Sequence, residues 1–252
     1  MNRDCDHCFD FPAPLLEALR EARHVAVLTG AGISAESGVP TFRDAQTGLW
    51  ASFKPEELAT PEAFRRNPKM VWEWYEWRRQ KVHSVAPNPG HLALVEIERR
   101  MLGFVLVTQN VDGLHQRAGS RRVIELHGNI TRTKCFDEDS FVEKWEETGA
   151  VPPRCPRCGG MLRPDVVWFG EMLPPAAIEA AEAAAQACDV FFSIGTSTVV
   201  YPAAALPFTA LRAGAVVVEV NPDETPLTEQ ASFSLRGPSG QVLPALVKAV
   251  WG

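Results

Sequence analysis

The sequence predicts an α/β protein in which a doubly wound parallel sheet carries a smaller second domain built from two insertions. Apolar runs of strand length recur along the chain. They are continuous rather than alternating, as in strands that helices cover on both faces. Segments with helical periodicity separate these runs. The predicted strands are 24–29, 103–108, 123–126, 190–194 and 215–220, and the predicted helices are 15–22, 91–100, 175–187, 202–212 and 242–251.

Two regions interrupt this alternation and predict the second domain. Residues 40–86 are rich in Trp, Arg and Pro and have helical periodicity, whereas residues 129–165 are polar and contain the segment CPRC. We expect both to leave the sheet and pack together as a small domain, with a helical part and a zinc-ribbon-like module. Residues 1–39, 87–128 and 166–252 then form the sheet domain.

Composition and charge exclude several classes of protein. The 252 residues, 46% hydrophobic and 22% charged, suit a globular enzyme, and a net charge of −6 without a basic stripe argues against a nucleic-acid partner. Residues 1–10 lack the apolar region of a signal peptide. The uncharged stretch between Asp189 and Arg212 contains prolines and hydroxyl side chains, which argues against a membrane-spanning helix. We therefore expect a soluble, cytoplasmic protein, monomeric and without a membrane partner.

A glycine-rich segment follows the first predicted strand directly. Residues 30–35 (GAGISA) fit G-x-G-x-x-A, in which glycines permit a tight turn and let the backbone approach a diphosphate at a helix N-terminus. A purely structural turn has the same composition, so this segment alone leaves both interpretations open. No second strand with a terminal acidic residue follows about 20 residues later, as it would in an ordinary dehydrogenase.

A longer match surrounds this segment. Residues 30–43 (GAGISAESGVPTFR) resemble the signature of the sirtuin family. Further sirtuin-like motifs follow in order: TQNVDGLH at 108–115, ELHG at 125–128, VWFGE at 167–171, GTS at 195–197 and VNP at 220–222. The resemblance extends from about Ala22 to the C-terminus. It implies a Rossmann-like sheet domain and an NAD-dependent protein-lysine deacylase, with NAD as co-substrate and acylated lysine side chains of proteins or peptides as partners.

The resemblance also implies the reaction. In sirtuins the acyl oxygen displaces nicotinamide from NAD, a histidine activates a ribose hydroxyl, and water finally releases free lysine and O-acyl-ADP-ribose. Two other classes stay open at this point. The same site could pass ADP-ribose to a protein or to water, as a mono-ADP-ribosyltransferase or an NAD hydrolase. CPRC could instead mark a non-catalytic interaction module.

By this resemblance the catalytic residues are His127, Asn110 and Asp112. His127 matches the general base, and the pKa of an imidazole suits it to accept a hydroxyl proton. Without the family match, a histidine that caps a strand would be the simpler interpretation. Asn110 is expected to orient the ribose and water, and Val111 and Asp112 to hold the nicotinamide amide.

The expected NAD site extends over several of these motifs. Phe42 is expected to cover the nicotinamide, Arg43 to lie near the ribose and phosphates, and Ser239, in the loop before the last predicted helix, to lie beside adenine. The full set of expected NAD-binding residues is Gly30, Ala31, Gly32, Ser34, Phe42, Arg43, Gln109, Asn110, Val111, Asp112, Gly195, Thr196, Ser197, Asn221 and Ser239.

Tyr75 and Arg78 indicate which acyl group is removed. A helix places residues three apart on one face, where an Arg guanidinium and a Tyr hydroxyl can together bind a carboxylate. This Tyr-x-x-Arg arrangement resembles class III sirtuins, which remove succinyl, malonyl and glutaryl groups, and Ala59 matches the small residue that leaves room for a longer acyl chain. The alternative is an amphipathic helix with a tryptophan core face and a solvated arginine. The substrate peptide is expected to add as a strand along Val167, Phe169, Gly170 and Glu171.

Sirtuins typically hold a structural zinc ion with two cysteine pairs, and this sequence keeps only part of that set. Cys155 and Cys158 form one C-x-x-C pair, but Cys135 has Glu138 where its partner would be. Because structural zinc sites are almost always four-coordinate, the incomplete set argues against zinc. Three alternatives stay open: a neighbouring carboxylate as fourth ligand, an N-terminal cysteine as fourth ligand, or no metal. The candidates for the fourth ligand are Asp137, Glu138, Asp139, Cys5 and Cys8.

Overall fold

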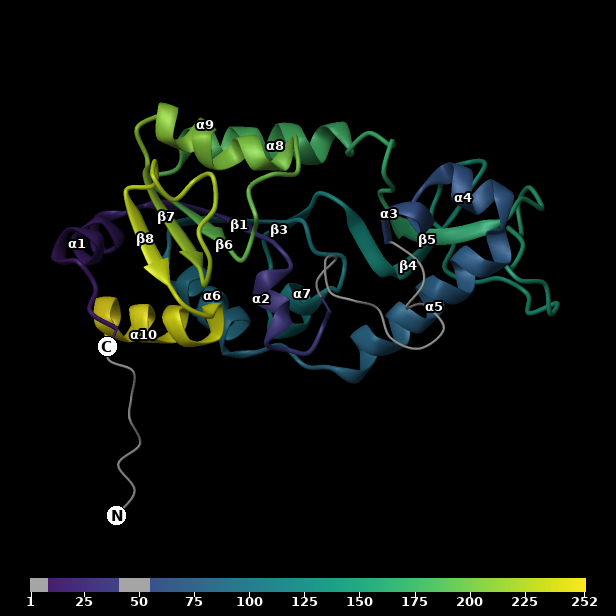
Figure 1. The fold of residues 1–252 in the computed structure, drawn as a ribbon, viewed down its shortest axis with the longest axis horizontal. Coiled ribbons are helices and arrows are strands. Elements are labelled where there is room, and N and C mark those ends of the chain that lie inside the picture. Colours follow the sequence, from purple (N-terminus) through teal and green to yellow (C-terminus); the bar gives the residue numbers. More distant parts are fainter. Residues whose placement is uncertain (1–8, 41–54) are drawn as a thin grey trace, which may run out of the picture.

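The computed structural model describes residues 9–40 and 55–252. Its main element is a parallel sheet in the order β3-β2-β1-β6-β7-β8 (Figure 1). The chain leaves β1 toward β2 and β3 on one side and returns to β6, β7 and β8 on the other, which is the doubly wound arrangement. The strands of this sheet are β1 (His24–Thr29), β2 (Gly103–Thr108), β3 (Val123–Glu125), β6 (Val190–Ile194), β7 (Val216–Asn221) and β8 (Phe233–Arg236).

Helices cover both faces of this sheet (Figure 1). Alternate residues of β1 show why: Val25 and Val27 pack into the apolar cluster on one face, and Ala26 and Leu28 into the cluster on the other. The first cluster includes helices α1 (Ala13–Glu21), α6 (Pro89–Arg100) and α10 (Ser239–Trp251), and the second includes α8 (Pro175–Ala187) and α9 (Leu206–Arg212). Two short helices, α2 (Gly32–Ala35) and α7 (Leu114–Ala118), follow β1 and β2. Across the described parts of the chain, every helix is too short or too polar to cross a membrane.

A two-stranded sheet and three helices form a second, smaller unit (Figure 1). Strand β4 (Gly128–Cys135) pairs antiparallel with β5 (Leu162–Val166). The helices are α3 (Pro55–Leu58), α4 (Pro61–Arg66) and α5 (Pro68–Ser84). Their apolar side chains share one core with the two strands, which includes Phe64, Trp74, Ile130 and Trp168. The domain boundaries expected from the sequence stay a prediction.

Local sequence explains where α4 and α5 begin. Thr60 and Asn67 precede them, and each side-chain oxygen accepts a hydrogen bond from a backbone N–H in the first turn, at 3.0 and 3.2 Å. A proline occupies the first helical position in both, where its missing N–H costs no hydrogen bond. These caps fix the start of the helix that carries Tyr75 and Arg78.

Three strands escaped prediction: β4, β5 and β8. Strand β4 (GNITRTKC) is polar, and β8 (FSLR) has only 4 residues and lies at the sheet edge, so neither forms a continuous apolar run. The predicted helix 202–212 is divided into a 3₁₀ helix, η2 (Ala203–Ala205), and α9. Helix α10 begins at Ser239 rather than at residue 242. Ser239 therefore lies in the first turn of this helix and not in the preceding loop.

Candidate active site

The candidate site gathers at the carboxyl ends of four neighbouring strands. Gly30 follows β1, Gln109 follows β2, Gly195 follows β6, and Asn221 ends β7. Two hydrogen bonds join these ends: Gln109 Nε2 donates to Thr196 Oγ1 (3.0 Å), and Asn221 Nδ2 donates to Thr196 O (2.9 Å). The strand order reverses between β1 and β6. Doubly wound folds bind ligands at such a switch point, outside the carboxyl ends of the strands.

Gly30 and Gly32 let the loop after β1 pack directly against the loop after β6. A Cβ atom added to Gly30 would lie 2.7 Å from Gly195 O, and one added to Gly32 would lie 2.7 Å from Gly195 Cα. Gly32 N donates to Gly195 O (2.8 Å), and Gly195 itself has a φ of +58°. Contact between two backbone loops therefore requires these glycines, in addition to the expected approach of a diphosphate.

Ser34, Asn110 and Asp112 form one buried hydrogen-bonded chain. Ser34 Oγ donates to Asp112 Oδ2 (2.7 Å) and accepts from Asn110 Nδ2 (3.2 Å), and Asn110 Nδ2 also donates to Gly30 O (3.0 Å). Leu114 N donates to Asp112 Oδ1 (2.9 Å) at the start of α7. Burial raises the pKa of Asp112, and the bonds from Leu114 and Ser34 oppose that rise. The chain fixes the orientation of the two polar side chains expected to act with His127.

His127 keeps one ring nitrogen available for proton transfer. Its Nδ1 lies 2.9 Å from Gln109 O. Because a carbonyl oxygen only accepts, Nδ1 carries the proton and Nε2 keeps its lone pair. Burial lowers the pKa of His127, and the bond to Gln109 O opposes this in part. A neutral imidazole with a basic Nε2 is the form that a general base requires.

The segment 167–171, which is expected to pair with a substrate peptide, already forms backbone hydrogen bonds within the protein along one of its edges. Val167 N donates to His127 O, and Phe169 N donates to Ala59 O, each over 2.9 Å. Gly170 is exposed, and the Phe169 side chain is 46% exposed. An added peptide strand would therefore have to use the opposite edge of this segment.

Glu171 holds this segment in place. Its Oε2 accepts from Trp168 N (2.8 Å) and from Arg163 Nη2 (2.9 Å), and its Oε1 accepts from Arg163 Nη1 (2.5 Å). The Arg163 guanidinium in turn lies 3.4 Å from the centroid of the Trp168 indole. The carboxylate of Glu171 thus serves the internal structure of the segment, and a backbone contact with substrate stays a prediction.

Tyr75 and Arg78 lie on one face of α5, next to the site. Tyr75 is 3% exposed, and its hydroxyl accepts from Trp168 Nε1 (2.9 Å). Burial raises the pKa of Tyr75 to about 12, although the charge of Arg78 opposes this. The Arg78 guanidinium lies 5.1 Å from the Trp74 ring centroid, and burial lowers its pKa, opposed by Tyr75 and Asp112. A half-buried arginine between these groups does not fit the alternative of a solvated surface residue.

Ser239 is held by a residue that the sequence did not single out. Its hydroxyl donates to Glu36 Oε1 (3.1 Å), and Gly240 N donates to the same oxygen (2.7 Å). The Glu36 carboxylate therefore lies at the N-terminus of α10. It joins this helix to the segment that follows α2. The expected contact of Ser239 with adenine stays a prediction.

The remaining expected residues are placed around the same strand ends. Ala31 precedes α2, Val111 O accepts from Ile130 N (2.8 Å), and Ser197 is half-buried in the loop after β6. Four residues named in the sequence analysis lie outside the described residues: Cys5, Cys8, Phe42 and Arg43.

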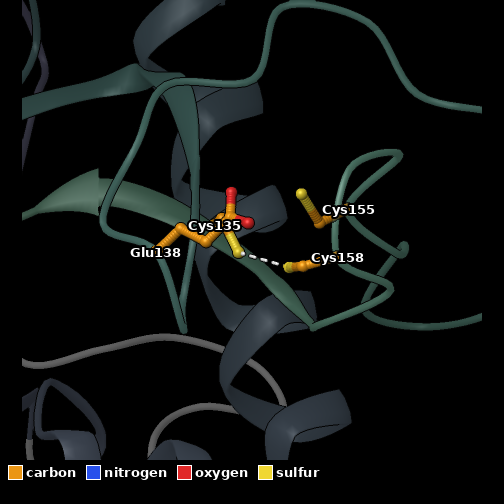
Figure 2. A group of neighbouring side chains, drawn as sticks. All are labelled: Cys135, Glu138, Cys155 and Cys158. Atoms are coloured by element: carbon orange, nitrogen blue, oxygen red, sulfur yellow. Dashed lines mark hydrogen bonds between the residues drawn. The ribbon is translucent and has the colours of Figure 1, made fainter.

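Three cysteines and one carboxylate meet near the end of the two-stranded sheet (Figure 2). One ligand atom from each of Cys135, Glu138, Cys155 and Cys158 lies within 4.8 Å of every other. Cys135 Sγ and Cys158 Sγ are 3.4 Å apart. Thiolates about 2.3 Å from one tetrahedral zinc ion lie about 3.8 Å from each other, so this group fits zinc. Of the carboxylates left open by the sequence, Glu138 is the one that joins the cysteines.

Arg157 brings a positive charge to this group. Its Nε donates to Glu138 Oε2 (3.1 Å), and this bond raises the pKa of Arg157. Three thiolates and a carboxylate around a divalent ion carry a net negative charge, which Arg157 offsets in part. The Arg157–Glu138 bond also aligns the carboxylate that would serve as fourth ligand.

Two residues that organise the site were not identified from the sequence, Glu36 and Trp168. Glu36 lies in the motif at 30–43 and Trp168 in the motif at 167–171. The available signals were physical: a carboxylate that needs a partner, and an indole N–H that must find an acceptor when buried.

Comparison with known proteins decides the family. The model of the Sir2 family matches residues 30–202. The chain belongs to the Sir2 family. Relatives within it include an "NAD-dependent protein deacylase" of Aquifex aeolicus, 56% identical over 86% of this chain and 90% of that protein. Another, "NAD-dependent protein deacylase 2" of Pyrobaculum aerophilum, is 53% identical over 93% of this chain and 94% of that protein.

Solved Sir2 structures have the same fold. A Sir2 homolog–NAD complex superposes with a TM-score of 0.89 at 47% identity, covering 96% of this chain and 94% of that chain. A Sir2 complex with a p53 peptide and NAD+ has a TM-score of 0.83 at 32% identity, covering 94% of this chain and 97% of that chain. The predicted Rossmann-like α/β fold and the family are therefore confirmed.

Proposed function

We propose that this Sir2-family chain is an NAD-dependent protein-lysine deacylase that removes succinyl and malonyl groups, and also acetyl groups. The products are nicotinamide, free lysine and O-acyl-ADP-ribose. The names of the relatives support deacylation with NAD, and the solved Sir2 homolog–NAD complex supports the co-substrate. The observation that carries the acyl preference is the placement of the buried Tyr75 and the half-buried Arg78 on one face of α5.

The residues at the carboxyl ends of the strands supply the donors and acceptors that NAD requires. The Nδ2 group of Asn110 donates to Gly30 O and to Ser34 Oγ. This leaves Oδ1 of Asn110 to accept a hydrogen bond from a ribose hydroxyl or a water. Asp112 keeps further lone pairs for a carboxamide N–H beyond its bonds to Ser34 and Leu114. When bound, NAD supplies the ribose that receives the acyl group.

His127 acts as the general base. Nδ1 is held by Gln109 O, so the ring cannot rotate freely and Nε2 points its lone pair in one direction. The lowered pKa keeps the ring neutral and able to take a hydroxyl proton. The proton then resides on Nε2, and the charged ring is stabilised by its bond to the Gln109 carbonyl.

Tyr75 and Arg78 recognise the carboxylate of a succinyl or malonyl group. A carboxylate that leaves water for an apolar cluster needs hydrogen-bond donors to replace its hydration, and the guanidinium and phenol supply them. Ala59 is 4% exposed and belongs to the same apolar cluster as Tyr75, where its side chain is a single methyl group. The charge of Arg78 also interacts with that of Asp112. The residue proposed to bind the acyl carboxylate is therefore electrostatically coupled to the residue proposed to bind the nicotinamide amide.

Product analysis tests this function directly. The protein is mixed with NAD and with succinyl-, malonyl- and acetyl-lysine peptides of one sequence, and all products are identified by mass. Faster release from the two acidic peptides, with O-acyl-ADP-ribose, supports the proposal. Activity on acetyl-lysine alone refutes the acyl preference while keeping the enzyme class. Loss of NAD without any change in the peptides indicates the alternative function, ADP-ribosyl transfer to protein or NAD hydrolysis.

Replacing Arg78 separates the acidic from the neutral acyl groups. We expect Arg78→Met to lower kcat/KM for the succinyl peptide about 10- to 100-fold, because a charge-assisted hydrogen bond is lost in a buried place. The acetyl peptide should be affected much less, because it has no carboxylate. Lys81→Met removes the same charge from an exposed position of α5 and serves as the control. Equal losses on both peptides would contradict the role of Arg78.

We also propose that Cys135, Glu138, Cys155 and Cys158 hold a structural zinc ion. Bound there, zinc would tie the loops around β4 and β5 together and take no part in the reaction. A cytoplasmic location, a monomeric state and the absence of a nucleic-acid partner stay predictions from the sequence.

A further inference from the structure

Trp168 directs its only polar atom at Tyr75. The indole is 1% exposed, and its Nε1 donates to the Tyr75 hydroxyl over 2.9 Å. An indole N–H is a donor only, so the direction of this bond is fixed: Tyr75 accepts and Trp168 donates.

This bond determines where the Tyr75 proton points. A phenolic O–H prefers the plane of its ring, which offers two positions for the hydrogen. Because the Trp168 N–H donates to this oxygen, the Tyr75 proton is directed away from Nε1, toward the other in-plane position. Among residues 9–40 and 55–252, none accepts a hydrogen bond from the Tyr75 hydroxyl, although Tyr75 is only 3% exposed and has little access to water. Burial keeps the phenol protonated, with its pKa raised to about 12.

The indole cannot turn away from Tyr75. The Arg163 guanidinium lies 3.4 Å from the centroid of the Trp168 ring, and Arg163 is itself fixed by Glu171 through two hydrogen bonds of 2.5 and 2.9 Å. Trp168 N also donates to Glu171 Oε2 (2.8 Å), and the Phe64 ring packs 5.2 Å from the indole. The donor is thus held before any substrate arrives, so no entropy is lost in ordering it.

We propose that Trp168 is a positioning residue for acidic acyl groups, because its indole N–H turns the Tyr75 hydroxyl into a donor aimed at the acyl carboxylate. This inference rests on the proposed function. A carboxylate is an acceptor only, so it gains from a phenol that is forced to donate. An acetyl group presents no such acceptor to Tyr75. Trp168 therefore discriminates between the two classes of acyl group without contacting either.

The test is Trp168→Phe, measured with succinyl- and acetyl-lysine peptides of one sequence. Phenylalanine keeps an aromatic ring under Arg163 and removes the donor. We expect KM for the succinyl peptide to rise about 5- to 10-fold, the effect of losing one oriented hydrogen bond. The acetyl peptide should change less than about twofold. A similar loss on both peptides would overturn the proposal and leave Trp168 with a packing role.

A double-mutant cycle with Tyr75→Phe strengthens the test. If Trp168 acts through the Tyr75 hydroxyl, Trp168→Phe should cause no further rise in the succinyl KM once that hydroxyl is gone. Independent, additive losses would contradict the proposal. A wild-type enzyme that does not prefer succinyl- or malonyl-lysine would instead refute the proposed function itself, so the two failures are distinguishable.

Trp168 belongs to the core of the small unit, and thermal unfolding should be followed for each variant. If Trp168→Phe does not fold, site-specific incorporation of 3-benzothienylalanine at position 168 replaces the N–H by sulfur and preserves the shape of the ring system. The same split between succinyl and acetyl KM is expected from this substitution. An unchanged succinyl KM in that protein would overturn the proposal.

Discussion

We expect His127 to enter the proposed reaction as a neutral ring, and its surroundings explain why. The carbonyl of Gln109 holds the proton on Nδ1, and burial lowers the pKa of the ring. A base with a lowered pKa stays unprotonated to lower pH. Nε2, the nitrogen proposed as the base, is therefore available throughout the neutral range.

The pH dependence of deacylation tests this state. We expect kcat/KM for an acetyl-lysine peptide to stay level as the pH falls to 6.5 and to decline only below it, because His127 gains its proton later than an ordinary histidine of pKa about 6.5. The acetyl peptide is used because it adds no titrating carboxylate. His127→Asn should abolish turnover at every pH. A decline centred above pH 6.5 would show that the histidine is not the group described.

At the scale of single residues, the motifs predicted which residues form the site better than they predicted the tautomers and hydrogen-bond partners of those residues. The sequence indicates His127, Asn110 and Asp112 as a group, and the structure brings Asn110 and Asp112 together through Ser34. The tautomer of His127 depends on a carbonyl 18 residues away, which no local pattern reveals. The sequence pairs Tyr75 with Arg78 but does not reveal its bond to Trp168, because that bond spans 93 residues of sequence.

At the scale of elements, strands β4 and β5 and the group of Cys135, Glu138, Cys155 and Cys158 form one unit. Cys135 ends β4, and Cys155 and Cys158 lie in the turn that leads to β5. The sequence left a carboxylate, an N-terminal cysteine or no metal open, because the path of a polar turn cannot be derived from its composition. Among the three carboxylates, Glu138 is the one that the structure places with the thiols, and it is bonded to Arg157.

Glu138→Gln tests that selection. We expect the purified protein to contain one equivalent of zinc and Glu138→Gln to weaken zinc binding about 10- to 100-fold, since a neutral amide is a poorer ligand than a carboxylate. Asp139→Asn, which alters the neighbouring carboxylate paired with Lys134, is the matched control and should bind zinc normally. Metal content and competition with a chelator provide the measurement. Less than about a tenth of an equivalent in the wild type would exclude the site.

Five strands of the main sheet were predicted from the sequence, whereas the edge strand β8 and the two strands of the small unit were not. The buried strands β1, β2, β6 and β7 are continuous apolar runs because helices cover both of their faces. Strand β4 exposes part of one face and is rich in Thr, Arg and Lys, so its pairing with β5 depends on tertiary packing rather than on its own pattern.

At the scale of the whole molecule, two buried histidines link stability to pH. His91 and His115 are 0% and 1% exposed, and their ring centroids are 4.9 Å apart. Burial lowers the pKa of His91 to about 4, and burial together with the neighbouring His91 lowers that of His115 to about 3. The unfolded chain binds protons at both sites below a pH of about 6.5, whereas the folded chain binds them only below about 4 at His91 and about 3 at His115.

Stability should therefore fall as the pH drops below 6.5. Each histidine removes up to about 1.4 kcal/mol from the free energy of unfolding per pH unit between its unfolded and folded pKa values. His91→Gln should reduce the steepness of this fall by about that amount, because glutamine does not titrate. Its side chain can still accept the hydrogen bond that Asn88 N donates to His91 Nδ1. Urea unfolding of both proteins at several values between pH 7 and 4.5 gives the comparison, and parallel curves would contradict it.

The contact of Gly30 and Gly32 with Gly195 has a consequence for how this molecule tolerates change. The two loops meet along a seam with no clearance, because a single methyl group at either of the first two positions would overlap backbone atoms of the third residue. A side chain at any of the three positions would therefore push the two loops apart, whatever ligand lies next to them. Other side chains at the strand ends can be exchanged to alter what is bound. The distance between the two loops is set by backbone atoms of glycines, which have no side chain to shorten.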